Sequence, residues 1–157
     1  MPASGDDPKR PVVASRFITL STMVVFGAVA LVHVYWALGG RRGSAAAVPS
    51  VSGRAVITPG HGVTLVVATL LFMAAAVLGL RAGIVNWPGL PSWIPAAGTW
   101  TAFAVMLLRF VGDFRYVGLF KRVVGTPFAT LDTKVYSPLC FALALGCACT
   151  ALAAHAE

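Results

Sequence analysis

The sequence has few charged residues and very few acidic ones. Five of its 157 residues are Asp or Glu, and charged residues of both signs make up 11% of the chain, against 58% that are hydrophobic. Soluble globular domains carry about 25% charged residues. This shortage of charge argues against an ordinary soluble domain, and it makes a lipid bilayer the expected solvent of the chain.

Cysteine is also scarce, and its spacing excludes most cysteine chemistry. The three cysteines, Cys140, Cys147 and Cys149, all fall in one apolar run. A helix would hold Cys140 and Cys147 about 10 Å apart along its axis, which is beyond the reach of a disulfide. Because the Cys-x-x-Cys spacing of thiol-disulfide enzymes is absent, we interpret the cysteines as small buried hydrophobic residues. No metal site is predicted.

Long apolar runs dominate what is present. Four runs approach the about 20 residues that a membrane-spanning helix needs, at residues 17–38, 62–80, 94–111 and 136–154. Backbone groups in lipid must be paired within the segment, and the runs lack the alternation of barrel strands, so each is predicted to be helical. The expected fold is an all-α integral membrane four-helix bundle. Residues 17–157 would form this single transmembrane domain, after a polar tail at 1–16.

Basic residues outnumber acidic ones, with twelve Lys and Arg and a net charge of +7. Most of them flank the apolar runs, where anionic lipid headgroups are met first, so lipid rather than nucleic acid is the expected partner. Eight of the twelve fall at the face that holds the connections 39–61 and 112–134. The positive-inside rule therefore predicts that these two connections are cytoplasmic.

Small residues recur every fourth position in two of the runs. They are Ala142, Gly146, Thr150 and Ala154 in the fourth run, and Ala75, Gly79 and Gly83 in the second. Such stripes let a neighbouring helix approach closely. They could serve the bundle itself or a homo-oligomer.

The stretch RFVGDFRYVGLFK, residues 109–121, concentrates charge and aromatic residues. Its apolar positions recur at helical spacing, so the third helix is expected to continue past the bilayer edge and to bend at Gly112 or Gly118. Arg109 and Asp113 are four residues apart and are expected to pair on one helical face. This pairing would offset the cost of placing a charge at the membrane edge.

Four antiparallel spans bring most of the distinctive polar residues to one membrane face. The candidate ligand-binding residues there are His33, Tyr35, Trp36, Arg109, Asp113, Arg115, Lys121, Asp132 and Tyr136, with His61 nearby. Arginine engages phosphate and carboxylate groups in bidentate fashion. The cluster is therefore predicted to bind an anionic lipid, a small acidic ligand or a partner.

The chain resembles a known family in several motifs. These are HVYWALGG at 33–40, Pro49 and Pro59 in the first connection, RFVGDFRYVGLFK at 109–121 and FATLDTKVYSPLC at 128–140. With the four-span layout, they resemble the DUF3995 family of bacterial membrane proteins. The resemblance implies a multi-pass protein of the bacterial inner membrane. It implies no activity, because the family is defined by its unknown function.

Two other functions remain open from the sequence. A small intramembrane enzyme acting on a lipid or isoprenoid would use His33 or Asp113 as general base, and Arg109, Arg115 and Lys121 as an anion clamp. A haem protein would use His33 and His61. The chain has no nucleophile motif and no carboxylate-rich or Glu-x-x-His motif, so catalytic residues and cofactor stay unassigned.

Overall fold

The computed structural model describes residues 9–51 and 54–154, and its long helices coincide with the apolar runs. The elements in chain order are α1 (Lys9–Ala37), α2 (Ser44–Ala47), β1 (Ser50–Val51), β2 (Arg54–Ala55), α3 (His61–Arg81), α4 (Trp93–Val111), α5 (Pro127–Leu131), the π-helical turn η1 (Asp132–Tyr136) and α6 (Ser137–Ala153). The predicted all-α class is confirmed, apart from the short antiparallel β1–β2 pair in the first connection.

Four helical segments are long and apolar enough to cross a membrane, as predicted. They cover Val13–Ala37, His61–Arg81, Trp93–Val111 and Pro127–Ala153. The fourth is longer than expected because α5, η1 and α6 follow one another without a break. The first helix begins at Lys9, so part of the expected polar tail is helical, whereas residues 1–8 lie outside the described part of the chain.

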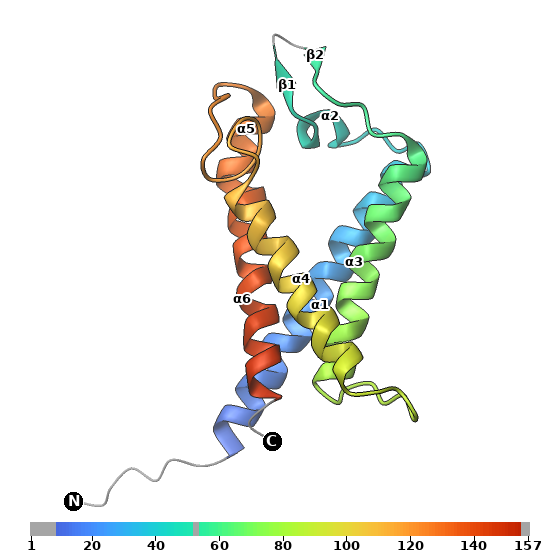
Figure 1. Ribbon diagram of the computed structural model, residues 1–157. Helices are drawn as coiled ribbons and strands as arrows, with labels where there is room; N and C mark the ends of the chain where they lie inside the picture. Colours follow the sequence, from blue (N-terminus) through green and yellow to red (C-terminus); the bar gives the residue numbers. More distant parts are fainter. Residues whose placement is uncertain (1–8, 52–53, 155–157) are drawn as a thin grey trace, which may run out of the picture.

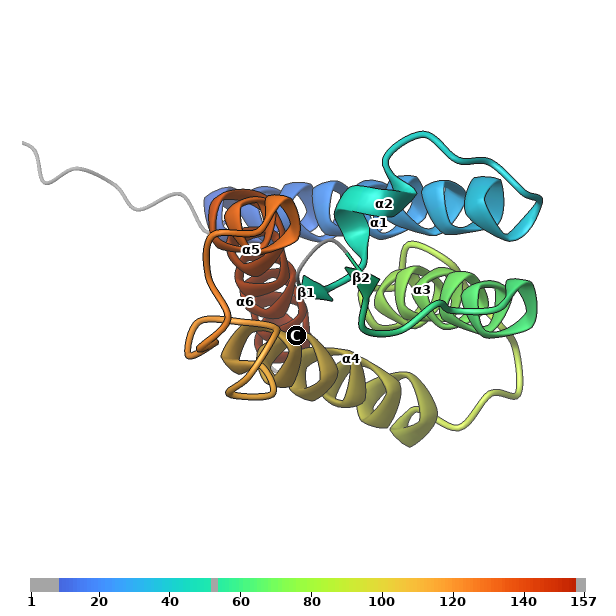
Figure 2. The same cartoon turned by 90° about the horizontal axis from the view of Figure 1, so that it is seen from above.

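The helices form two pairs that diverge toward one end of the molecule. Figure 1 shows α1 beside α3 and α4 beside α6, with the pairs crossing in the lower half and spreading apart above. The α2 helix and the β1–β2 hairpin lie over the upper end between the pairs, and the view from above shows the same placement (Figure 2). Both long connections therefore lie at the same end, as an even number of crossings requires.

Small residues allow the helices to touch where the pairs cross. Gly146 of α6 faces Thr22 of α1 so closely that no side chain would fit, and Gly98 of α4 is in similar contact with Val77 of α3. The hydrophobic core lies at this crossing and consists of Phe26, Ala30, Leu71, Leu78, Ala102, Leu143 and Cys147. Gly146, one of the small residues of the fourth span, thus serves the packing of the bundle itself.

A buried hydrogen bond adds to this contact. The hydroxyl groups of Thr19 in α1 and Thr150 in α6 lie 2.9 Å apart, and Thr150 also donates to the carbonyl oxygen of Gly146 at 2.9 Å. Hydrogen bonds between helices in lipid typically contribute about 0.6 kcal/mol. The bond links α1 to α6 below the crossing.

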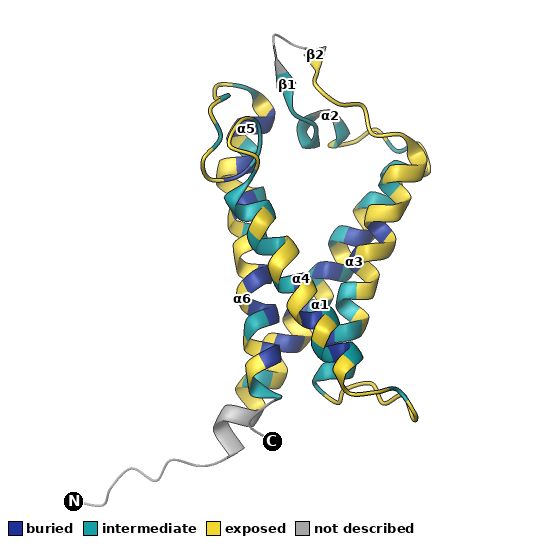
Figure 3. Ribbon diagram, in the orientation of Figure 1, coloured by how far each residue is buried: buried dark blue, intermediate teal, exposed yellow. Residues whose placement is uncertain are grey.

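Outside the core, large apolar side chains remain exposed on every long helix (Figure 3). Val24 of α1 is 70% exposed and Leu108 of α4 is 69% exposed. Exposed apolar side chains in this number are unusual for a soluble monomer. The protein is therefore a multi-pass membrane protein whose outer helix faces contact lipid.

One prediction about the third helix was wrong. The helix does not continue through the charged stretch but ends at Val111, because Gly112 adopts φ 88° and ψ −170°. A left-handed φ of this kind ends the helical hydrogen-bond pattern and suits glycine, which has no Cβ. Residues 112–126 form an irregular loop instead.

Candidate functional site

The predicted polar residues lie at the upper end of the bundle, where α1 and α4 end and α3 and α5 begin (Figure 1). They do not form one cluster. One group surrounds Asp132 at the junction of α4, the 112–126 loop and the fourth span. The other group lies around His33 and His61, at the ends of α1 and α3.

Asp132 is the centre of the first group and has no solvent exposure. Its Oδ1 accepts a hydrogen bond from Arg109 Nη2 at 2.9 Å, and its Oδ2 accepts one from Lys121 Nζ at 3.0 Å. The backbone N–H of Gly118 donates to Oδ2 at 2.8 Å, and the Ser137 hydroxyl donates to it at 3.3 Å. A buried carboxylate is tolerated only when it is paired and hydrogen-bonded in this way. We name Arg109, Lys121 and Asp132 the ionic cluster.

Two glycines shape the loop so that its backbone reaches Asp132. Gly112 and Gly118 have φ values of 88° and 87°, and a side chain on either would overlap backbone atoms across the loop. The chain closes on itself there, since the N–H of Leu119 donates to the Phe110 carbonyl at 2.8 Å. The closure directs the Gly118 N–H at Asp132 and brings Lys121, whose side chain is 4% exposed, to the same carboxylate.

Asp113 does not pair with Arg109, which corrects the prediction from sequence. Its Oδ1 accepts hydrogen bonds from the backbone N–H groups of Arg115, Tyr116 and Val117, at 2.9, 2.7 and 2.9 Å. Burial raises the pKa of the Asp113 carboxyl. The hydrogen bonds from the three backbone N–H groups together lower it by more, so the pKa lies below its ordinary value. Asp113 thus holds the loop through its Oδ1. The prediction failed because α4 ends before residue 113, so the helical spacing no longer applies.

The exposed part of this loop carries aromatic and basic side chains. Phe114 and Phe120 stack with ring centroids 6.0 Å apart, and the Arg115 guanidinium lies 5.1 Å from the centroid of the Tyr116 ring. Phe114 and Phe120 are more than half exposed. Arg115 faces outward with them and is not part of the ionic cluster.

The fourth span begins at the same place. Thr126 caps α5 by accepting a hydrogen bond from Ala129 N at 3.0 Å, and Pro127 follows at the first helical position. One π-helical turn, Asp132–Tyr136, then precedes α6. The Tyr136 hydroxyl donates to the Ala46 carbonyl of α2 at 3.4 Å. Tyr136 therefore links the fourth span to the first connection.

The second group lines a pocket of about 390 Å³ between the ends of α1 and α3 and the first connection. We name it the polar pocket. Its lining residues are His33, Trp36, Gly39, Gly40, Arg41, Ser44, Ala47, Val48, Pro59, His61, Val63, Thr64 and Val67. None of them is acidic, and Arg41 is exposed. The formal charge of the pocket is therefore positive.

The two histidines of the polar pocket each bond a backbone carbonyl through the same ring nitrogen, Nδ1. His33 Nδ1 lies 2.8 Å from the Val29 carbonyl oxygen, and His61 Nδ1 lies 2.6 Å from the Ala37 carbonyl oxygen. Since a carbonyl oxygen only accepts, each Nδ1 must carry the proton. Nε2 is then left in both rings to accept a hydrogen bond.

Tyr35 and Trp36 hold the first connection against the end of α1. Trp36 Nε1 donates to the Arg42 carbonyl at 2.9 Å, and the Arg42 N–H donates to the Tyr35 hydroxyl at 3.3 Å. The Tyr35 ring lies directly against Gly40, where no side chain would fit. Trp36 also contacts the His33 ring edge-on, with centroids 5.2 Å apart. These contacts form one wall of the polar pocket.

Several residues of both groups were not predicted. Ser137 and the Gly118 N–H complete the shell of Asp132, while Arg41 and Ser44 line the polar pocket. The Gly-Gly-Arg-Arg stretch at 39–42 was the available signal, since it pairs turn residues with cations directly after a span. No comparable signal marks Gly118, whose role depends on backbone geometry. Within the described residues, no three His, Cys, Asp or Glu side chains lie close enough to hold a metal ion.

Comparison with known proteins identifies the family of the chain. The model of a family described as "Protein of unknown function (DUF3995)" matches residues 26–147, which is most of the chain and includes both groups. The chain belongs to the DUF3995 family. No curated protein and no solved structure matches it.

Proposed function

We propose that this protein binds an anionic group, a lipid headgroup or a small acid, in the polar pocket at one face of the membrane. The observation that carries the proposal is the composition of the pocket wall. Arg41, His33 and His61 line a space of about 390 Å³ with no acidic residue among its walls. Because no carboxylate lines this space, an anion that enters it is not repelled by a negative charge.

The two histidines present the same ring nitrogen to a ligand. Each ring bonds a backbone carbonyl through Nδ1, so Nε2 is the ring nitrogen that remains for a hydrogen bond with a ligand in the pocket.

The ionic cluster has a different role in this proposal from the one expected at first. Arg109 and Lys121 are engaged by Asp132, so they position the 112–126 loop rather than clamp the ligand. One carboxylate facing two cations still leaves a formal charge of +1. This charge adds to the positive potential of the face and favours an anionic ligand at long range.

The face itself is proposed to be cytoplasmic, in a bacterial inner membrane. The support is the excess of Lys and Arg at the two connections that meet there. Reporter fusions inserted after Gly43 and after Gly125 test this placement. Both reporters should show cytoplasmic activity, and periplasmic activity of both would reverse the orientation.

The binding test compares two adjacent arginines. Arg41 lines the polar pocket, whereas Arg42 is exposed outside it, so Arg41→Gln and Arg42→Gln remove the same charge from the same face. Native mass spectrometry of the detergent-solubilised protein would measure retention of phosphatidylglycerol against phosphatidylcholine, and retention of glycerol 3-phosphate. Arg41→Gln should lower retention of the anionic molecules by about tenfold, which corresponds to about 1.4 kcal/mol. Equal losses in the two variants would contradict binding in the polar pocket.

Catalysis on a lipid or isoprenoid is the second candidate, favoured by one observation. His33 lines the polar pocket and bonds the Val29 carbonyl through Nδ1, so its Nε2 remains as the ring nitrogen that could act as a general base. The lipid recovered from the binding experiment distinguishes the two functions. A product of altered mass that forms with the wild type and not with His33→Gln would support an enzyme.

A further inference from the structure

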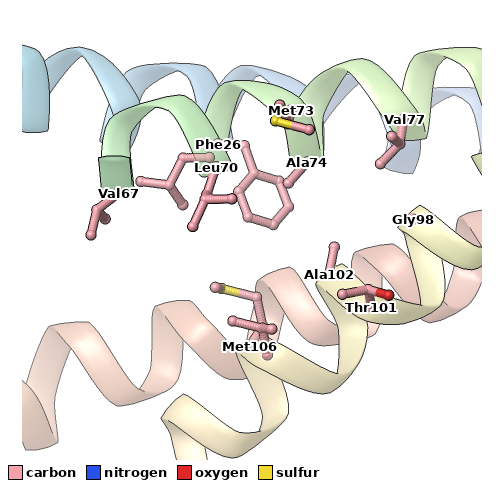
Figure 4. A pocket seen from close by; sticks show the side chains of 12 residues that line it. Phe26, Val67, Leu70, Met73, Ala74, Val77, Gly98, Thr101, Ala102 and Met106 are labelled. Carbon is pink, nitrogen blue, oxygen red and sulfur yellow. The ribbon is translucent and has the colours of Figure 1, made fainter. Parts of the chain in front are cut away.

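An apolar groove between α3 and α4 shares a lining residue with the polar pocket. The groove has a volume of about 390 Å³ and is lined by Phe26, Val67, Leu70, Leu71, Met73, Ala74, Val77, Gly98, Thr101, Ala102, Val105 and Met106. Figure 4 shows the α3 and α4 side chains facing one another across it, with Phe26 of α1 behind them. Val67 lines both the groove and the polar pocket, so the two spaces adjoin.

The chemistry of the groove suits hydrocarbon alone. None of its lining residues is charged. Thr101 carries a hydroxyl, but this group already donates to the Ala97 carbonyl at 2.8 Å. A polar or hydrated ligand would lose its hydrogen bonds there without replacement. Within a bilayer such a space is filled by the surrounding acyl chains.

The groove lies along the central part of the spans. Its α3 wall extends from Val67 to Val77, eleven residues with a rise of about 15 Å at 1.5 Å per residue. Because α3 covers His61–Arg81, this wall begins six residues after the start of the helix and ends four residues before its last residue. At the far end Gly98 packs directly against Val77, so the groove closes there. An acyl chain that enters beside the polar pocket would therefore extend past the middle of α3.

We infer that the ligand is an anionic phospholipid of the leaflet next to the polar pocket, with its headgroup beside His33, Arg41 and His61 and one acyl chain in the groove. The inference rests on the proposed binding of an anion in the polar pocket. It adds the class of ligand, because a small soluble acid would fill the pocket and leave the groove unused. The charge of the pocket selects the headgroup, and the apolar wall from Val67 to Val77 holds the chain.

The test fills the groove while leaving the polar pocket intact. Thr101 lines the groove and is exposed, and Ala104 is exposed on the same helix outside it. Thr101→Trp should therefore block the acyl chain, whereas Ala104→Trp adds the same side chain to a lipid-facing position. Dioleoyl phosphatidylglycerol and glycerol 3-phosphate are the probes, and retention by native mass spectrometry is the readout.

Thr101→Trp is expected to weaken retention of the phospholipid by about threefold or more, since an acyl chain gains mainly packing contacts over those in bulk lipid. Retention of glycerol 3-phosphate should stay unchanged, and Ala104→Trp should behave as the wild type. A second measurement uses phosphatidylglycerol with a diazirine on one acyl chain. The diazirine should form crosslinks to Met73 and Met106, and an excess of unlabelled phosphatidylglycerol should prevent them.

The outcomes separate the inference from the proposed function. If Arg41→Gln weakens phospholipid binding and Thr101→Trp does not, the polar pocket binds the headgroup and the groove inference is overturned. If neither variant changes binding, the proposed function fails as well. Stronger retention of glycerol 3-phosphate than of the phospholipid would identify the ligand as a soluble acid and would also overturn the inference.

Discussion

Arg109 Nη2 lies 2.9 Å from Asp132 Oδ1, and this ion pair joins the last turn of the third span to the start of the fourth. The two residues are 23 positions apart in the chain. Between them the 112–126 loop turns back and contributes Lys121 and the Gly118 N–H to the same carboxylate. Asp132 therefore fixes three segments relative to one another.

Removing the carboxylate should destabilise the protein strongly. Asp132→Ala leaves the nearly buried Lys121 ammonium and the Arg109 guanidinium without their opposite charge, although Lys121 still donates to the Gly118 carbonyl. Losses of about 3–5 kcal/mol are usual for a broken buried pair. Thermal unfolding of the detergent-solubilised protein would measure the effect. Asp113→Ala, which removes an exposed carboxylate from the same loop, is the control and should lower the melting temperature far less. Similar melting temperatures of the two variants would contradict the central role of Asp132.

Arg109→Leu should lower stability or expression more than Arg122→Leu. Arg109 is bound to Asp132 at the end of α4, whereas Arg122 is exposed on the 112–126 loop. Exposed charges contribute about 0–1 kcal/mol, so loss of Arg122 should leave the melting temperature nearly unchanged. Yield and melting temperature of the two purified variants provide the comparison. Equal tolerance of both changes would argue against the ionic cluster as a stabilising element.

The close backbone approach in the loop predicts a large effect of Gly112→Ala. Gly112 combines a φ of 88° with backbone contact to Val117 and Gly118, whereas Gly125 has a φ of 80° and open space around it. A left-handed conformation costs about 1–2 kcal/mol for a residue with a Cβ. Gly125→Ala should lower the free energy of unfolding by this amount and no more. Gly112→Ala should cost more than this, because the overlap adds to the strain. Thermal unfolding of both variants measures the difference.

Acid should loosen the loop through Asp113. The folded pKa of its carboxyl lies below the ordinary value of 3.8 because three backbone N–H groups donate to it. A lowered folded pKa gives a stabilising contribution that is complete above the unfolded pKa and is lost as the pH falls through the folded pKa. Carbon-detected NMR titration of the protein in micelles should show a midpoint for Asp113 below 3.8. A midpoint above that value would contradict the three hydrogen bonds.

The sequence predicted the membrane class and the four spans because these depend on local properties. The length and continuity of an apolar run decide whether its backbone must form a helix in lipid, and neither requires knowledge of neighbours in space. Because two spans separate the first connection from the third, the sequence also predicted correctly that these connections lie at the same end. The length of the fourth helical segment was underestimated, since the polar residues Asp132, Thr133 and Lys134 of η1 separate the apolar start of the segment from the run that begins at Val135.

The partners of the polar residues could not be read from the sequence. The Arg109–Asp113 pairing assumed a continuous helix, but the positive φ of Gly112 ended that helix at Val111, two residues before Asp113. Likewise, His33 and Arg109 were expected in one cluster. The divergence of the two helix pairs instead placed His33 at the polar pocket and Arg109 beside Asp132.

The sequence by itself thus determined where the chain meets lipid and which residues reach each membrane face. The tertiary structure decided which charges are neutralised, which pocket remains positively charged, and how that pocket adjoins the groove at Val67. The reason is physical: transfer into a bilayer depends on each segment's own composition. An ion pair or a pocket, in contrast, depends on how helices cross, and here contacts at Gly98 and Gly146 set that crossing.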